Sequence, residues 1–330
     1  MRITWLFPII LYLFSCFILR AQDIHWSQIN QLQSFQNPSY IGQYNEDIKF
    51  TFAAKDQWRS VTKPYQTYFA SFDTRLRKFE WLSIGCNVFT DVTGDGSLRT
   101  NQFNCISKIE SKINSKLSSS FGIDIGFTNK NIDFSYFKFD NQYDGFKYNS
   151  TLSSNESYSN TSFNYPTIGI GFLSTYKLKK NHELSMGFSI YNINNPKESF
   201  YQIEVSRPIR NVLNLTYNYF NKNHLIISTI NVVQQGTYHE ILLGTLDNIK
   251  INNKKIHHLH TGIAYRYLDA LILHLGLSYK KSKLIISYDI NTSKLKVASN
   301  GRGSLEINLQ YLLKKNPLTF PINRTCIDYF

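Results

Sequence analysis

The chain has 330 residues and a net charge of +13. Its mean hydropathy of −0.29 is too low for a bundle of membrane-spanning helices and excludes that class of protein. A membrane β-barrel is not excluded, because only every second side chain of its strands touches lipid. Aromatic residues make up 15% of the chain, with 22 Tyr and 24 Phe but only 2 Met, and this composition favours strands.

The first predicted element is a secretory signal peptide over residues 1–21. Its apolar run from Trp5 to Leu19 is shorter than the roughly 20 residues that cross a bilayer as a helix. A lipoprotein signal ending at Cys16 is the alternative, but bulky Phe14 makes it a poor processing site. The mature chain is therefore expected to be exported and to begin near Gln22.

Residues 22–47 are expected to form an N-terminal periplasmic or plug segment. After them, apolar and polar residues alternate in run after run, as in strands with two different faces. In the run 271–279 every odd position is large and apolar, and the run 305–311 alternates without interruption. Many runs reach roughly 9 to 11 residues, the length of a tilted membrane strand, whereas strands of soluble proteins average about 5 to 6.

The fold class predicted from this pattern is all-β, a transmembrane antiparallel up-and-down β-barrel of about 14 strands over residues 48–313. An even number of strands places both ends of the barrel on the periplasmic side, followed by a C-terminal periplasmic tail over residues 314–330. The predicted strands are 48–56, 66–74, 81–90, 98–109, 117–128, 165–178, 183–192, 209–220, 225–233, 238–246, 256–267, 270–280, 283–291 and 303–313.

The connections between these runs differ in length at the two ends. The long ones, 129–164 and 193–208, are expected to be outer loops, and the short basic or Asn-rich ones to be periplasmic turns. Segment 140–164 is rich in Ser, Asn and Tyr, so it is either disordered or folded over the pore. The loops supply candidate aromatic anchors for a partner or, alternatively, fold themselves: Tyr136, Phe137, Tyr143, Phe146, Tyr148, Phe200 and Tyr201.

Motifs for other chemistry are weak. The sequence has no GxSxG, HExxH or phosphate-binding loop, and no cofactor is expected. The cluster at 257–260 could hold a metal through His258 and His260, although a polar lumen explains it equally well. Segment 91–97 has Asp and Gly as calcium loops do, but lacks the closing Glu and fits an ordinary hairpin turn. Scattered basic clusters give no nucleic-acid-binding surface.

The cysteines that follow the signal are an odd number, so they cannot form a complete disulfide framework. Cys86 and Cys105 fall on the apolar faces of their runs, where free thiols behave as small apolar side chains. Cys86 and Cys105 are therefore expected to be free thiols.

Several short motifs occur in a recognisable order: Gln22-Asp23 with Ser27-Gln28, then Asn37-Pro38, Asp56-Gln57-Trp58, Arg266 with Asp269, and Asp289. This order resembles the PorP/SprF family of outer-membrane proteins of the Bacteroidetes type IX secretion system. Ile24 and Leu305 depart from the family pattern without changing a chemical role. Without the resemblance, Trp58 would be read as a girdle residue at the lipid head groups.

The resemblance implies a non-enzymatic outer-membrane barrel that serves as partner or anchor in the export and surface attachment of large proteins such as adhesins. Implied partners are the C-terminal domain of a type IX-secreted surface protein, periplasmic or outer-membrane secretion and motility components, and the lipid bilayer. A passive channel for small solutes is the alternative function. An outer-membrane hydrolase is disfavoured, because no nucleophile and base are placed together by a motif.

Overall fold

The computed structural model describes residues 24–59, 63–94, 97–156, 161–200, 205–253, 255–294 and 296–314. The predicted signal peptide and all but the first residue of the predicted C-terminal tail lie outside these residues. Within the described part, neither α-helix has the length and hydropathy needed to cross a membrane.

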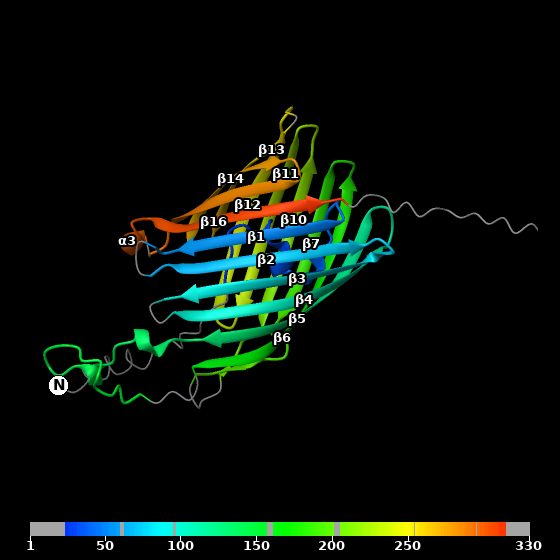
Figure 1. The fold of residues 1–330 in the computed structure, drawn as a ribbon. Helices are drawn as coiled ribbons and strands as arrows, with labels where there is room; N and C mark the ends of the chain where they lie inside the picture. Colours follow the sequence, from blue (N-terminus) through cyan, green and yellow to red (C-terminus); the bar gives the residue numbers. More distant parts are fainter. Residues whose placement is uncertain are drawn as a thin grey trace, which may run out of the picture.

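Fourteen antiparallel strands form a closed barrel (Figure 1). Each strand of the barrel pairs with the strands before and after it, and β1 pairs with β16, with Phe52 opposite Leu309, to close the wall. The strands are β1 (Ile48–Gln57), β2 (Tyr65–Leu76), β3 (Phe79–Thr93), β4 (Leu98–Lys112), β5 (Leu117–Asn131), β6 (Ser162–Lys179), β7 (His182–Tyr191), β10 (Arg210–Phe220), β11 (His224–Gln235), β12 (Tyr238–Lys250), β13 (Ile256–Arg266), β14 (Ala270–Tyr279), β15 (Ser282–Asn291) and β16 (Arg302–Leu313).

The prediction of an antiparallel barrel of about 14 strands is confirmed. Several strands are longer than expected: β3 continues to Thr93 and β12 to Lys250. Polar residues such as Thr90 and Asp247 take outward positions there and interrupt the apolar alternation, but the backbone ladder continues through them. The alternation therefore locates the strands and underestimates their polar ends.

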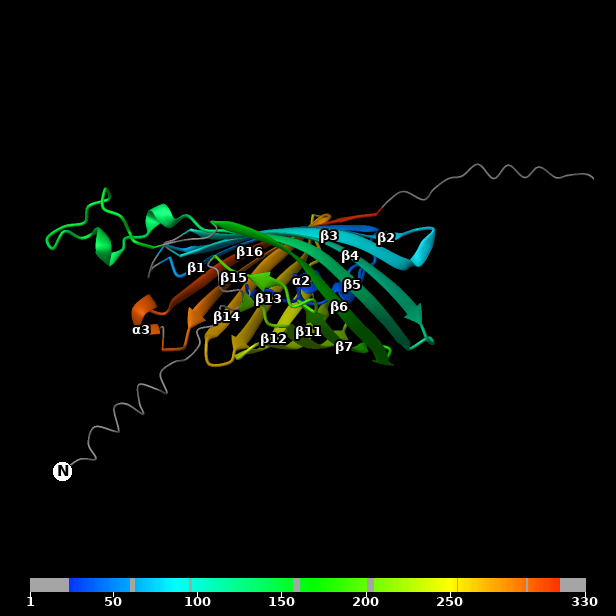
Figure 2. The ribbon, with the colours of Figure 1, turned by 90° about the horizontal axis from the view of Figure 1, so that it is seen from below.

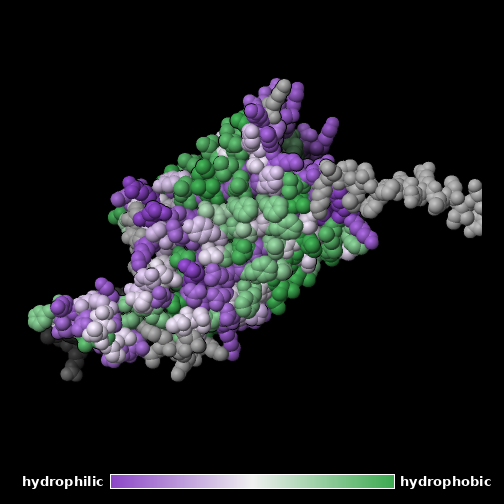
Figure 3. All heavy atoms as spheres, in the orientation of Figure 1, coloured by the Kyte–Doolittle hydropathy of each residue, from purple (hydrophilic) through white to green (hydrophobic). Residues whose placement is uncertain are grey.

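The two faces of the wall follow the alternation of the sequence. On β14, Leu273 is 46% exposed on the outside of the barrel, whereas Ile272 is 0% exposed on the inside. Figure 3 shows apolar residues spread over the middle of the strands and hydrophilic residues toward the connections. An apolar outer surface of this kind is what a barrel presents to lipid.

The connections are unequal at the two ends of the barrel. One end, here the loop end, carries the connections 58–64, 94–97, 132–161, 192–209, 236–237, 267–269 and 292–301. The other, the turn end, carries 77–78, 113–116, 180–181, 221–223, 251–255 and 280–281. Besides the barrel, connection 192–209 contains a short hairpin of β8 (Lys197–Glu198) and β9 (Val205–Ser206), and connection 292–301 contains α3 (Lys296–Ser299).

Residues 24–47, here the plug, lie inside the barrel and include α2 (Gln33–Gln36) and the 3-10 turn η1 (Pro38–Tyr40). Figure 2 shows α2 between the walls of the barrel. Ile24 lies among residues of the loop end, and Gly42 binds Asp73 near the turn end, where β1 begins. β1 therefore begins at the turn end, and the plug reaches it from the loop end by running through the lumen.

A small aromatic core holds the plug against β1, β2 and β3. Trp26 and Phe35 from the plug pack edge to face on Phe69, with ring centroids 6.1 and 6.0 Å apart, and Phe35 packs on Phe89 at 5.8 Å. Trp26 is 1% exposed, so nearly all of its surface is removed from water. Burial of such side chains stabilises the docked plug by about 1.5–3 kcal/mol each.

Candidate functional site

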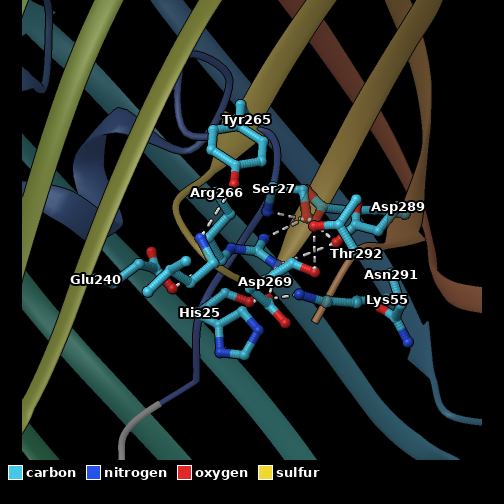
Figure 4. A network of polar contacts seen from close by, with 12 residues as sticks. His25, Ser27, Lys55, Glu240, Tyr265, Arg266, Asp269, Asp289, Asn291 and Thr292 are labelled. Carbon is cyan, nitrogen blue, oxygen red and sulfur yellow. Dashed lines mark hydrogen bonds and ion pairs between the residues drawn. The ribbon is translucent and has the colours of Figure 1, made fainter. Parts of the chain in front are cut away.

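The candidate site is the polar lumen around the plug, and its most highly charged part is the cluster in Figure 4. Arg266, at the loop end of β13, donates to Asp269 at 2.9 Å and to Asp289 at 3.2 Å, and its Nε lies 3.5 Å from Glu240. Ser27 of the plug accepts from Arg266 at 2.8 Å and donates to Asp289 at 2.8 Å. The plug is thus part of a buried network of charges.

Glu306 of β16 extends this network along the plug backbone. Its two carboxylate oxygens accept the backbone N–H groups of Ser27 at 2.8 Å and Gln28 at 3.0 Å. Lys55 of β1 donates to the backbone carbonyl of His25 at 2.7 Å. Hydrogen bonds to charged groups contribute about 1.5–3 kcal/mol each when buried.

His25 is the titratable group of the plug that faces this cluster. Burial, followed by the nearby charges of Lys55 and Arg266, holds the pKa of His25 well below its usual value. Its Nε2 is buried without a hydrogen-bond partner. His25 is therefore neutral in the docked plug, and the surrounding cations disfavour its protonation.

The Asn37-Pro38 pair fixes the middle of the plug to β5, β6 and β7. The Asn37 side chain donates to the backbone carbonyls of Phe172 at 3.0 Å and Phe188 at 3.3 Å, and accepts from the Ser39 N–H at 2.9 Å. Asn37 is 0% exposed, so these bonds satisfy an amide that has no access to water.

Glycines on the facing strands make room for this pair. A Cβ at Gly122 would lie 2.6 Å from the Pro38 carbonyl carbon, and a Cβ at Gly171 would lie 2.1 Å from Asn37 Oδ1. Strand interiors disfavour glycine unless another backbone approaches closely, which is the case here. Asn37 and Pro38 are therefore docking residues of the plug.

Asp56, Gln57 and Trp58 lie at the loop end of β1. Asp56 pairs with exposed Arg59, whereas Trp58 adopts a φ of 60° and packs against Tyr65 with ring centroids 4.9 Å apart. Trp58 lines a cavity of the lumen. The alternative of a lipid-facing girdle residue is therefore wrong for Trp58, because the turn at this residue directs the ring inward.

The aromatic residues expected to bind a partner divide into two groups. Tyr136, Tyr143 and Phe146 are exposed by 55%, 49% and 100%. Phe137 packs on Phe134, and Phe200 on both Phe134 and Phe163, at centroid distances from 4.7 to 6.4 Å. The long loop extends away from the barrel rather than across its opening (Figures 1 and 2).

Of the two remaining aromatic residues of this set, only Tyr148 lies in the described part of the chain. Tyr148 packs on Tyr143 at 5.7 Å, with which it also forms an isolated β-bridge. Tyr201 lies outside the described residues. Tyr136, Tyr143 and Phe146 therefore expose ring surface to a partner, while Phe137, Phe200 and the Tyr143–Tyr148 pair hold the loops together.

A metal site is not supported by the lumen histidines. His260 uses both ring nitrogens, since its Nδ1 binds Asn248 and its Nε2 binds Ser278 at 2.7 Å. In the described part of the chain, no group of three His, Cys, Asp or Glu side chains could hold a metal ion. Cys86 and Cys105 lie opposite each other on β3 and β4 as free thiols, as expected.

Sequence reasoning missed the residues that join the plug to the wall. Lys55 and Glu306 stand at inward positions of their strands, but lumen polarity alone explains such residues in any barrel. Their pairing with the plug depends on the path of residues 24–47, which have no periodic pattern. The one signal in the sequence was that charged residues of both signs occupy strand positions that face the lumen.

Comparison with known proteins identifies a matching family and solved structures with a similar fold. The family model described as "Type IX secretion system membrane protein PorP/SprF" matches residues 18–311. No curated protein matches the chain. Solved structures with a similar fold include "CymD monoaromatic hydrocarbon channel", at 12% identity over 87% of this chain and 94% of that chain, with a TM-score of 0.51.

A second similar structure is "Crystal structure of a Pseudomonas aeruginosa FadL homologue". It shares 10% identity over 85% of this chain and 94% of that chain, with a TM-score of 0.51. At such low identity these likenesses concern the fold alone, which is that of outer-membrane barrels.

Proposed function

Because the chain belongs to the PorP/SprF family of type IX secretion system membrane proteins, we propose that it is a non-enzymatic outer-membrane barrel that holds a secreted surface protein. In this role it anchors the C-terminal domain of a large protein, such as an adhesin, during export and surface attachment. The loop end faces outward and meets this partner. Secretion or motility components in the periplasm or outer membrane meet the turn end.

The observation that carries the proposal is the contrast between the lumen and the loop end. The lumen contains a plug whose residues Trp26, Leu32 and Asn37 are at most 1% exposed. The loop end instead presents Tyr136 and Phe146 on a long projecting connection. Exposed aromatic side chains supply large contact areas at low entropic cost, which supports a role in binding another protein.

The test combines three substitutions, Tyr136→Ser, Tyr143→Ser and Phe146→Ser, and measures surface display of the protein that copurifies with the barrel from native outer membranes. We expect display to fall while the level of the barrel stays unchanged. Val297→Ser is the matched control, because Val297 is 87% exposed at the same end but lies on α3. Unchanged display in the triple variant would exclude the long loop as the docking surface.

A passive channel for small solutes is the second candidate function. It is favoured by a cavity of about 530 Å³ inside the loop end and by the fold likeness to a protein described as a hydrocarbon channel. Conductance of the purified barrel in planar bilayers separates the two functions. Steady single-channel currents from the wild-type barrel would support the channel, whereas currents only after removal of residues 24–40 would support a plugged anchor.

A further inference from the structure

The cavity inside the loop end, here the vestibule, is closed on one side by the plug. It has a volume of about 530 Å³ and lies between the plug and the loop-end parts of β1 to β7 and β10. One wall is apolar or aromatic and consists of Ile24, Phe35, Trp58, Tyr65 and Phe89. Its volume falls within the range of about 300–1,000 Å³ that is usual for ligand pockets.

Three cations also line the vestibule, Lys130, Arg207 and Arg210, and Arg210 lies against the aromatic wall. The carbon of its guanidinium lies 4.9 Å from the ring centroid of Phe35 and 5.1 Å from that of Tyr191. The side chain is 6% exposed and donates to Gln36 Oε1 at 3.3 Å. Among the described residues Arg210 forms no ion pair, and its side-chain hydrogen bond to Gln36 uses one of five N–H donors.

Asp124 of β5 also lines the vestibule and is 3% exposed. Among the described residues, no hydrogen bond or ion pair reaches its carboxylate, not even from Arg210. Buried charged groups are normally paired or hydrogen-bonded, because their transfer from water is costly. The vestibule therefore presents a guanidinium that is not ion-paired and a carboxyl group without a hydrogen-bond partner among the described residues, beside an aromatic surface.

We propose that the vestibule binds the C-terminal end of a polypeptide. The terminal carboxylate accepts hydrogen bonds from Arg210, the last backbone N–H donates to Asp124, and the last side chain packs on Trp58 and Phe89. A terminal residue carries an acceptor and a donor side by side, which matches two opposite charges that do not neutralise each other directly. The plug blocks a chain that would run through, so a chain end fits better than an internal segment.

This inference rests on the proposed function for the identity of the ligand as part of a secreted protein. The site itself can be tested without that protein. The probe is acetyl-glycyl-phenylalanine with a free carboxylate, and its C-terminal amide is the matched control. The full mature barrel is titrated with each peptide in detergent, and binding is measured by isothermal titration calorimetry.

We expect saturable binding of the free acid and binding at least tenfold weaker for the amide. Arg210→Gln should weaken binding of the acid about tenfold to a hundredfold, because it removes a charge-assisted hydrogen bond, and Arg210→Lys should restore part of it. Asp124→Asn should also weaken binding, and it leaves the contact between Arg210 and Gln36 in place. Heat-modifiable migration on gels confirms that each variant still forms the barrel.

Equal binding of acid and amide, or no saturable binding in the folded wild type, would overturn the inference. Failure of the proposed function is a separate outcome, in which the barrel binds the free acid but copurifies with no secreted protein. When a partner does copurify, a photoreactive residue at Thr100 in the vestibule wall must cross-link to its C-terminal peptide. Cross-links from Thr100 only to internal peptides of that partner would also refute the inference.

Discussion

Glu306→Ala should release the plug from the wall of β16 without unfolding the barrel. The substitution removes both carboxylate acceptors of the Ser27 and Gln28 N–H groups, at 2.8 and 3.0 Å, and leaves these groups buried. Each hydrogen bond to a charged group is worth about 1.5–3 kcal/mol, so at least about 3 kcal/mol of docking free energy is lost. This loss corresponds to at least a hundredfold increase in the undocked population.

Hydrogen exchange measured by mass spectrometry on peptides covering residues 24–31 reports this population directly. We expect exchange there to accelerate at least a hundredfold, while the peptides of β5 and β11 keep their protection. Glu183→Ala is the matched control, since that carboxylate binds Asn218 near the turn end and does not contact the plug. Unchanged protection of residues 24–31 in Glu306→Ala would refute the role assigned to the carboxylate.

Three further predictions concern the lipid face, the plug seat and pH. Leu273→Arg should lower the amount of folded barrel far more than His274→Arg, because an Arg facing the membrane centre costs about 2–4 kcal/mol. Equal amounts of the two folded variants on heat-modifiability gels would mean that the lipid and lumen faces are wrongly assigned. Gly122→Ala should undock the plug in exchange measurements while the barrel persists, since the new Cβ meets Pro38 at 2.6 Å. Docking should weaken as pH falls below about 6.5, the pKa of free His, because the pKa of His25 is lowered only in the docked plug; protection factors, which correct for the pH dependence of intrinsic exchange, should fall from pH 7.5 to pH 5.5 less in His25→Gln than in the wild type.

The barrel could be predicted from the sequence because each strand carries its own evidence. Leu273 and Ile272 reach opposite faces by the geometry of a single strand, and no distant residue has to be known. The long and short connections follow directly once the strands are placed. Alternation does not reveal how far a ladder continues once an outward position is polar, as at Thr90 of β3.

The plug and its contacts could not be predicted in the same way. Ser27 and Glu306 are separated by 279 positions, and no local pattern relates them. Gly122 and Gly171 read as small inward residues until the path of Asn37 and Pro38 is known. Family resemblance pointed to Arg266, Asp269 and Asp289, and the structure shows Arg266 and Asp289 bonded to Ser27 of the plug, with Asp269 bonded to Arg266.

The direction of the plug constrains the order in which the molecule is assembled. Ile24 lies at the loop end, the chain descends through the lumen, and β1 starts at the turn end, so the wall surrounds a segment that precedes it in the sequence. Insertion of this segment into a finished barrel would require threading a free end past the buried charges of Arg266 and Glu306. Placement of the plug before β1 and β16 pair avoids that step, and the last seam then encloses a lumen that is already occupied.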